Sequence, residues 1–121
     1  MFRETLQKMI ERTEGATGAL IMGMDGIAVE KVLTPAAREA NLDVAAAEFT
    51  SLVRSAQRAG GDIGLGQVNE VILGFGDVSV LMRLFNRDYF VLLAISKDGN
   101  VGRGRFEMRK VELDLSREFS L

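Results

Sequence analysis

The stretch of residues 18–32 constrains the fold most, because its pattern is that of two strands joined by a tight turn. Two apolar runs, residues 19–22 and 27–32, flank Asp25-Gly26. Asp-Gly between apolar runs is typical of a β-hairpin, since glycine adopts positive φ without a Cβ clash. The first run is apolar throughout, whereas the second carries Glu30 and Lys31. We predict strands at about 17–23 and 27–33, with the second near a sheet edge.

Two amphipathic helices are predicted around this hairpin. The first contains Phe2, Leu6, Met9 and Ile10 at helical spacing and stops near Gly15. The second spans about 43–59, with Asn41 or Asp43 as the N-cap and Gly60-Gly61 as the end. Its expected core stripe consists of Ala45, Phe49, Leu52, Val53 and Ala56.

The second half of the chain is predicted to form three strands and a final helix. The strands are expected at about 67–75, 78–86 and 89–96, and the last is so apolar that it should be central. The helix should span about 101–119, with an apolar stripe of Gly104, Met108, Val111, Leu115 and Phe119. Phe106 and Leu113 lie on another side, which we expect to contact the first helix. The result is a single α+β domain over residues 1–121, with one five-stranded antiparallel sheet covered by helices.

Composition argues against side-chain catalysis. The 121 residues include no cysteine and no histidine, which removes thiolate chemistry, the commonest general base and the commonest metal ligand. We expect no enzyme activity, cofactor or metal. The formal net charge is −2, without the basic stripe of a nucleic-acid binder, and no apolar run suits a membrane span or a signal peptide. A cytoplasmic protein is the expectation.

Two glycine-rich stretches could in principle hold phosphate, but both are better explained structurally. Residues 60–66 lack the Gly-Lys-Ser/Thr ending of a P-loop, so a connector is favoured. Residues 99–105 open the last helix with Arg103 and Arg105, and there the glycines more simply allow close packing on the sheet. The aspartates at 25, 62, 77, 88 and 98 are interpreted as turn residues, and Glu107 with Arg103 and Lys110 as pairs on a solvated helix face.

The order of elements and several motifs resemble the roadblock (dynein-light-chain-like) family, in particular its bacterial MglB-like members. The matching features are residues 18–22 with Asp25-Gly26, the alanine-rich middle helix ending at Gly60, the meander, and residues 98–110. The resemblance implies the middle helix on one face of the sheet and the two terminal helices on the other. It also implies a homodimer built by pairing the third strand with its mate.

The same resemblance implies that the paired middle helices form a platform for a bacterial Ras-like small GTPase (MglA-like), whose hydrolysis the dimer regulates. Candidates for the GTPase interface are Ala47, Ser51, Arg54, Ser55 and Arg58. Candidates for the dimer strand are Gln67, Val68, Asn69, Glu70, Val71, Ile72 and Leu73. This stretch carries only one charge, Glu70, so an exposed edge strand here would be prone to pairing with another strand. An arginine supplied in trans to the GTPase is not expected, because such regulators reorient the GTPase's own residues. A non-catalytic scaffold of the same fold and a small-ligand sensor remain alternatives.

Overall fold

The computed structural model describes residues 2–35 and 42–119, and the elements follow the predicted order. The helices are α1 (Phe2–Arg12), α2 (Leu42–Asp62) and α3 (Val101–Phe119), and the strands are β1 (Ala16–Gly23), β2 (Ala28–Leu33), β3 (Glu70–Gly74), β4 (Val78–Leu84) and β5 (Tyr89–Ser96). The five strands form one antiparallel sheet in the order β2-β1-β5-β4-β3. β5 is therefore central and β2 lies at an edge, as predicted.

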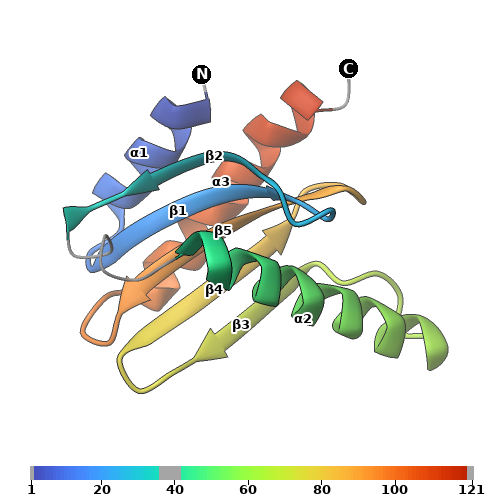
Figure 1. The fold of residues 1–121 in the computed structure, drawn as a ribbon. Coiled ribbons are helices and arrows are strands. Elements are labelled where there is room, and N and C mark those ends of the chain that lie inside the picture. Colours follow the sequence, from blue (N-terminus) through green and yellow to red (C-terminus); the bar gives the residue numbers. More distant parts are fainter. Residues whose placement is uncertain (1, 36–41, 120–121) are drawn as a thin grey trace.

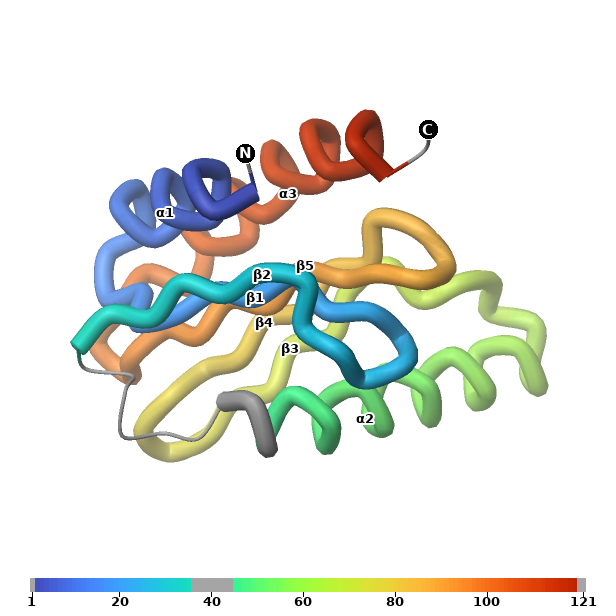
Figure 2. The backbone as a smooth tube through the Cα atoms, turned by 45° about the horizontal axis from the view of Figure 1, so that its top comes forward, coloured from blue at the N-terminus to red at the C-terminus, as the bar shows by residue number. Residues whose placement is uncertain are grey.

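The sheet separates two helical layers (Figures 1 and 2). α1 and α3 cover one face, where Leu6 and Met9 pack with Met108, Val111 and Leu115. α2 covers the other face, where Ala46 and Val53 pack with strand residues such as Phe90 and Leu92. The arrangement of helices expected from the family resemblance is confirmed. Among residues 2–35 and 42–119, none of the helices combines the length and the hydropathy that a membrane span requires.

Close packing of α3 on the sheet depends on glycine. A Cβ at Gly104 would lie 2.5 Å from Ile95 Cδ1, and one at Gly99 would lie 2.7 Å from the Glu14 carbonyl oxygen. The structural interpretation of these two glycines is confirmed.

Several predicted details of the helices are wrong. α2 does not end at Gly60-Gly61 but continues to Asp62, so that aspartate is helical and not in a turn. The chain leaves the helix at Gly64, whose φ of +71° provides the left-handed stop. The helix begins at Leu42; the capping assignment to Asn41 lies outside the described residues.

The second apolar side of α3 does not contact α1, because Phe106 and Leu113 are exposed. Glu107 takes that place instead. Its carboxylate is buried between the helices, 3.9 Å from Arg12 Nη1 of α1 and 3.2 Å from Arg103 Nη2. The Glu107 pairs are present, but they do not lie on a solvated face.

Candidate functional site

Most of α2 faces away from the sheet. From residue 45 onward only Ala46, Thr50, Val53 and Gly60 are buried, and all four have small or medium side chains. Thr50 satisfies its hydroxyl within the helix by donating to the Ala46 carbonyl at 2.8 Å. The predicted core stripe is thus rotated, since Leu52 is 46% exposed. A long helix with so narrow a buried stripe leaves two flanks for contacts with other molecules.

One flank of α2 carries all the residues predicted to contact a GTPase. Each of the five is exposed: Ala47, Ser51, Arg54, Ser55 and Arg58. Arg54 donates a hydrogen bond to the Met24 carbonyl in the β1–β2 turn, so this flank faces that hairpin. Ser51, Arg54 and Arg58 line one shallow hollow together with Gln57. Ala47, Ser51, Arg54, Ser55 and Arg58, which we call the platform residues, therefore form one exposed surface of α2 that can bind a partner.

The other flank of α2 lies toward β3. Helical geometry places Phe49, Leu52 and Ala56 on the side away from Arg54. Phe49 packs against the sheet core beneath α2, whereas Leu52 is exposed. Five of the nine large exposed hydrophobic side chains of the described residues belong to α2, β3 or the segments that follow them: Leu52, Ile63, Leu65, Ile72 and Phe75. This excess of exposed apolar side chains in and after α2 and β3 favours an interaction surface there.

β3 is an edge strand with free backbone groups. In the described part of the chain it has a strand neighbour only on the β4 side. Phe75 donates to the Val78 carbonyl at 2.9 Å and Leu84 donates to the Asn69 carbonyl at 3.0 Å, with regular antiparallel register between them. Because such pairing alternates, Glu70, Ile72 and Gly74 direct their N–H and C=O groups outward. These groups can accept a further strand.

The strand is shorter than predicted. β3 spans Glu70–Gly74, so only Glu70, Val71, Ile72 and Leu73 of the seven dimer-strand candidates belong to it. Gln67, Val68 and Asn69 precede the strand. Together with Gln57, Gly61 and Leu84 they line an open hollow of about 1000 Å³ at the start of β3.

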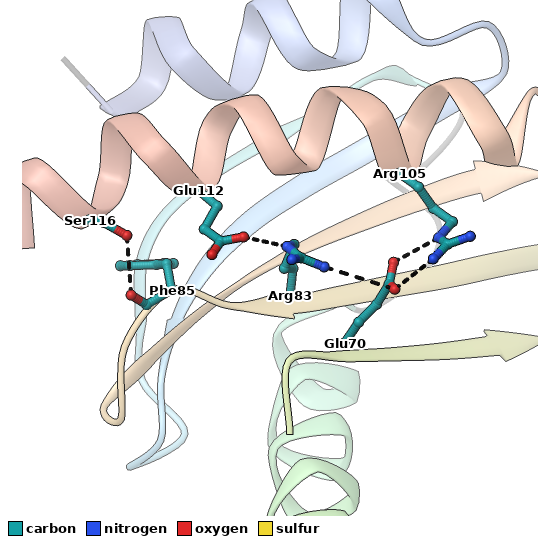
Figure 3. A network of polar contacts seen from close by, with 6 residues as sticks. All are labelled: Glu70, Arg83, Phe85, Arg105, Glu112 and Ser116. Atoms are coloured by element: carbon teal, nitrogen blue, oxygen red, sulfur yellow. Dashed lines mark hydrogen bonds and ion pairs between the residues drawn. The ribbon is translucent and has the colours of Figure 1, made fainter. Parts of the chain in front are cut away.

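An ion-pair network ties β3 to α3 (Figure 3). Arg105 Nε and Nη2 donate to the two carboxylate oxygens of Glu70 at 2.8 and 2.9 Å. Arg83 lies between Glu70, at 3.9 Å, and Glu112, to which its Nε donates a hydrogen bond. Two-point pairing between an arginine and a carboxylate is geometrically specific. The network therefore holds the first residue of the edge strand in place.

Sequence reasoning did not find this pair. Glu70 and Arg105 are 35 residues apart, and no local spacing connects them. The only available signal was that Glu70 is the single charge in an otherwise apolar strand. A charge there suggests a partner on the neighbouring layer.

The hydrogen bond from Arg105, helped by the charges of Arg105, Arg83 and Arg109, holds the pKa of Glu70 below its ordinary value of 4.5 although partial burial opposes this. A carboxylate whose pKa is lowered on folding stabilises the fold above its unfolded-state pKa. That contribution is lost as pH falls through the lower, folded-state pKa.

We expect Glu70→Gln to lower the free energy of unfolding at pH 7. The difference from the wild type should shrink as pH falls below 4.5, because protonated Glu70 resembles glutamine. Urea unfolding followed by circular dichroism at pH 7 and pH 3 measures this, with exposed Glu11→Gln on α1 as the control. A difference for Glu70→Gln that is the same at both pH values would contradict the assignment.

The arrangement is suited to binding through an extended surface. In residues 2–35 and 42–119 there is no cluster of three or more potential metal ligands. The lowered pKa belongs to a carboxylate engaged with arginine, which is a structural role. What remains is a broad surface made of one helix flank and one strand edge.

Comparison with known proteins agrees with the fold. The family model for the Roadblock/LC7 domain matches residues 2–97. MglC from Myxococcus xanthus superposes with a TM-score of 0.70 and 33% identity over 98% of both chains. A structure described as MglB with tetrameric arrangement gives 0.86 at 17% identity over 95% of this chain and 85% of that one. The gliding protein MglB from Thermus thermophilus gives 0.86 at 16% identity with the same coverage. No curated protein matches the sequence.

Proposed function

The chain belongs to the Roadblock/LC7 domain family, and we propose that residues 1–121 work as a single domain in a homodimeric regulator of a bacterial Ras-like small GTPase. The observation that carries the proposal is the free edge of β3 beside an apolar flank of α2. We propose that this margin pairs with a second copy and that the platform residues bind the GTPase in the cytoplasm.

Dimerisation is supported by the physical chemistry of the edge. Glu70, Ile72 and Gly74 present unpaired backbone groups at this edge, the Ile72 side chain is exposed on the face toward α3, and Leu52 is exposed on the flank of α2 toward β3. A two-fold partner would satisfy those groups and cover the apolar side chains in a single self-complementary contact. MglB, a protein of the same fold, has been found in a tetrameric arrangement.

The platform follows from the dimer. Pairing through β3 places the two α2 helices side by side on one face of a continuous sheet. Their flanks toward β3 meet each other, whereas Arg58 and Ser51 stay exposed on the outer flanks. Arginine is enriched at interface hot spots, so Arg58 is the strongest candidate for a large contribution.

The proposed regulator binds and reorients its partner without a catalytic residue of its own. Arg54 is already engaged with the Met24 carbonyl, Arg105 with Glu70, and Arg103 with Glu107. Arginines held in this way are poorly placed to enter the active site of another protein. The effect on hydrolysis would come from stronger binding to one conformational state of the GTPase.

A turnover experiment tests the proposal. The co-encoded small GTPase is assayed for GTP hydrolysis with and without this protein, and the protein is titrated against the GTP-loaded and GDP-loaded forms. We expect tighter binding to the GTP form and a changed hydrolysis rate. Different affinities with an unchanged rate favour the scaffold, and equal affinities with an unchanged rate remove the regulator.

Charge reversal at Arg58 tests the platform. We expect Arg58→Glu to weaken GTPase binding by about tenfold or more, since loss of an interface arginine commonly costs over 1 kcal/mol. Isothermal titration calorimetry measures the change. Lys8→Glu, an equivalent reversal on the exposed surface of α1 in the opposite layer, is the control. An equal loss in both variants would place the binding surface elsewhere.

A further inference from the structure

The register of the proposed dimer can be derived from the β3 edge. Residues of β3 whose backbone N–H and C=O groups point outward must face residues of the same kind in the partner's β3. A two-fold axis therefore passes through an equivalent pair of β3 residues. An axis at Ile72 uses all three outward residues, because it pairs Ile72 with the partner's Ile72 and Glu70 with the partner's Gly74. An axis at Glu70 would instead oppose two carboxylates, which is destabilising. The pairing centred on Ile72 is therefore the favoured one.

This register determines what lies beyond the strand. Phe75 follows Gly74 at the β3–β4 turn and is 58% exposed. Phe75 lies three positions after Ile72, so it comes opposite the residue three positions before the partner's Ile72, which is the partner's Asn69. By strand alternation Phe75 points to the same face as Val71 and Leu73, which pack in the core beneath α2. A two-fold axis perpendicular to the sheet leaves the partner's α2 on that face as well.

Asn69 borders the open hollow at the start of β3. The hollow of about 1000 Å³ lies between Gln57 and Gly61 of α2, the chain before β3, and residues 84–87 at the end of β4, and it extends to Glu112 of α3. Gly61 leaves room there, since a Cβ at that position would meet no atom within 4 Å. A phenyl ring entering from the strand edge would contact the Val68 and Leu84 side chains, and the amides of Gln57 and Asn69 would surround its rim.

We infer that Phe75 of each protomer inserts into the hollow at the start of the partner's β3, so that the dimer is locked at both ends of the paired strands. The inference rests on the proposed homodimer and adds its register and the residue that fills the hollow. The hollow is incomplete in one chain and is closed by the second copy.

Two substitutions of exposed phenylalanines test the insertion. We expect Phe75→Ala to raise the dimer dissociation constant by about 10²-fold, since two buried rings are lost and each contributes about tenfold. Phe106→Ala is the matched control, because Phe106 is 53% exposed on α3 and lies outside the inferred interface. Sedimentation equilibrium over a concentration series measures both, and the control should change the constant less than threefold.

A spectroscopic test separates insertion from dimerisation. The chain has no tryptophan, so Phe75→Trp gives a single indole, which can be excited apart from the one tyrosine. We expect its emission to shift to the red on dilution below the dissociation constant, whereas Phe106→Trp should not change. A dimeric Phe75→Trp protein with the emission of an exposed indole would overturn the insertion.

The register has its own test, because the chain also has no cysteine. In the inferred register two Ile72 residues form a hydrogen-bonded pair with Cα atoms about 5.5 Å apart, within reach of a disulfide. Ile72→Cys should therefore cross-link into a covalent dimer on mild oxidation, faster than Val71→Cys or Leu73→Cys.

The possible results separate the two proposals. A wild-type protein that is monomeric at all concentrations overturns both the homodimer and the insertion. A stable dimer in which Phe75→Ala behaves like Phe106→Ala overturns the insertion alone and leaves the hollow for another ligand. Preferential cross-linking through Val71 or Leu73 overturns the register, and with it the placement of Phe75.

Discussion

Ile72→Pro is expected to give a folded protein that cannot form the proposed homodimer. Proline has no N–H, and in a sheet it is tolerated on an edge strand where the N–H faces solvent. The Ile72 N–H points away from β4, so the fold of the single chain should persist. At the dimer edge the same change removes two backbone hydrogen bonds and leaves two carbonyl groups unpaired at about 1–3 kcal/mol each. The dissociation constant should rise by more than about 10²-fold.

The neighbouring position supplies the control. The Val71 N–H points to β4, because Val71 pairs with Met82 on the hydrogen-bonded side of the ladder. We expect Val71→Pro to detach β3 and lower the thermal unfolding midpoint. Ile72→Pro should keep the circular dichroism spectrum of the wild type and sediment with the mass of a monomer. A dimeric Ile72→Pro protein would show that the copies associate through another surface.

Gly15→Ala is expected to lower the free energy of unfolding by roughly 3 kcal/mol or more, a large part of the 5–15 kcal/mol of a typical domain. Gly15 has a φ of +84°, which costs an alanine about 1–2 kcal/mol. Its Cβ would also lie 2.4 Å from Gly99 Cα, and such crowding typically adds about 1–3 kcal/mol. The site joins the end of α1 to the turn before α3, since Ser96 donates to the Gly15 carbonyl at 2.8 Å.

Gly26→Ala separates the two causes. Gly26 has nearly the same φ, +87°, but no atom lies within 4 Å of a Cβ there. Gly26→Ala should therefore lower the free energy of unfolding only by the conformational cost of positive φ, about 1–2 kcal/mol. Denaturant unfolding measures both variants, and equal losses would show that the contact between Gly15 and Gly99 relaxes freely.

The hydrophobic pattern of the sequence was sufficient to predict the bounds of an element when that element has the same kind of surroundings along its whole length. β5 and α3 have the predicted bounds. β5 is covered on both faces, so that nearly all of its residues are buried, and α3 has a regular apolar stripe. The bounds of α2 could not be predicted from its two glycines. Gly60 is buried near the chain at Gly66, and a Cβ there would lie 3.2 Å from the Gly66 carbonyl oxygen, so it is retained for packing within the helix.

The candidate site was harder to predict because apolar side chains do not reveal what they contact. Leu52 has the spacing of a core residue but is exposed on the flank toward β3. Phe106 and Leu113 likewise have helical spacing and face solvent. Hydrophobicity alone cannot distinguish a core residue from one reserved for another molecule, and the strand order was needed to make that distinction.

The central position of β5 has a consequence for synthesis on the ribosome. β5 is the last strand to emerge, yet it alone joins β1 to β4. Until residue 96 has left the exit tunnel, the nascent chain holds two separate hairpins, each with an unpaired inner strand of apolar residues. Folding of this domain should therefore wait until all five strands have emerged, and the half-made chain is the species most in need of a chaperone.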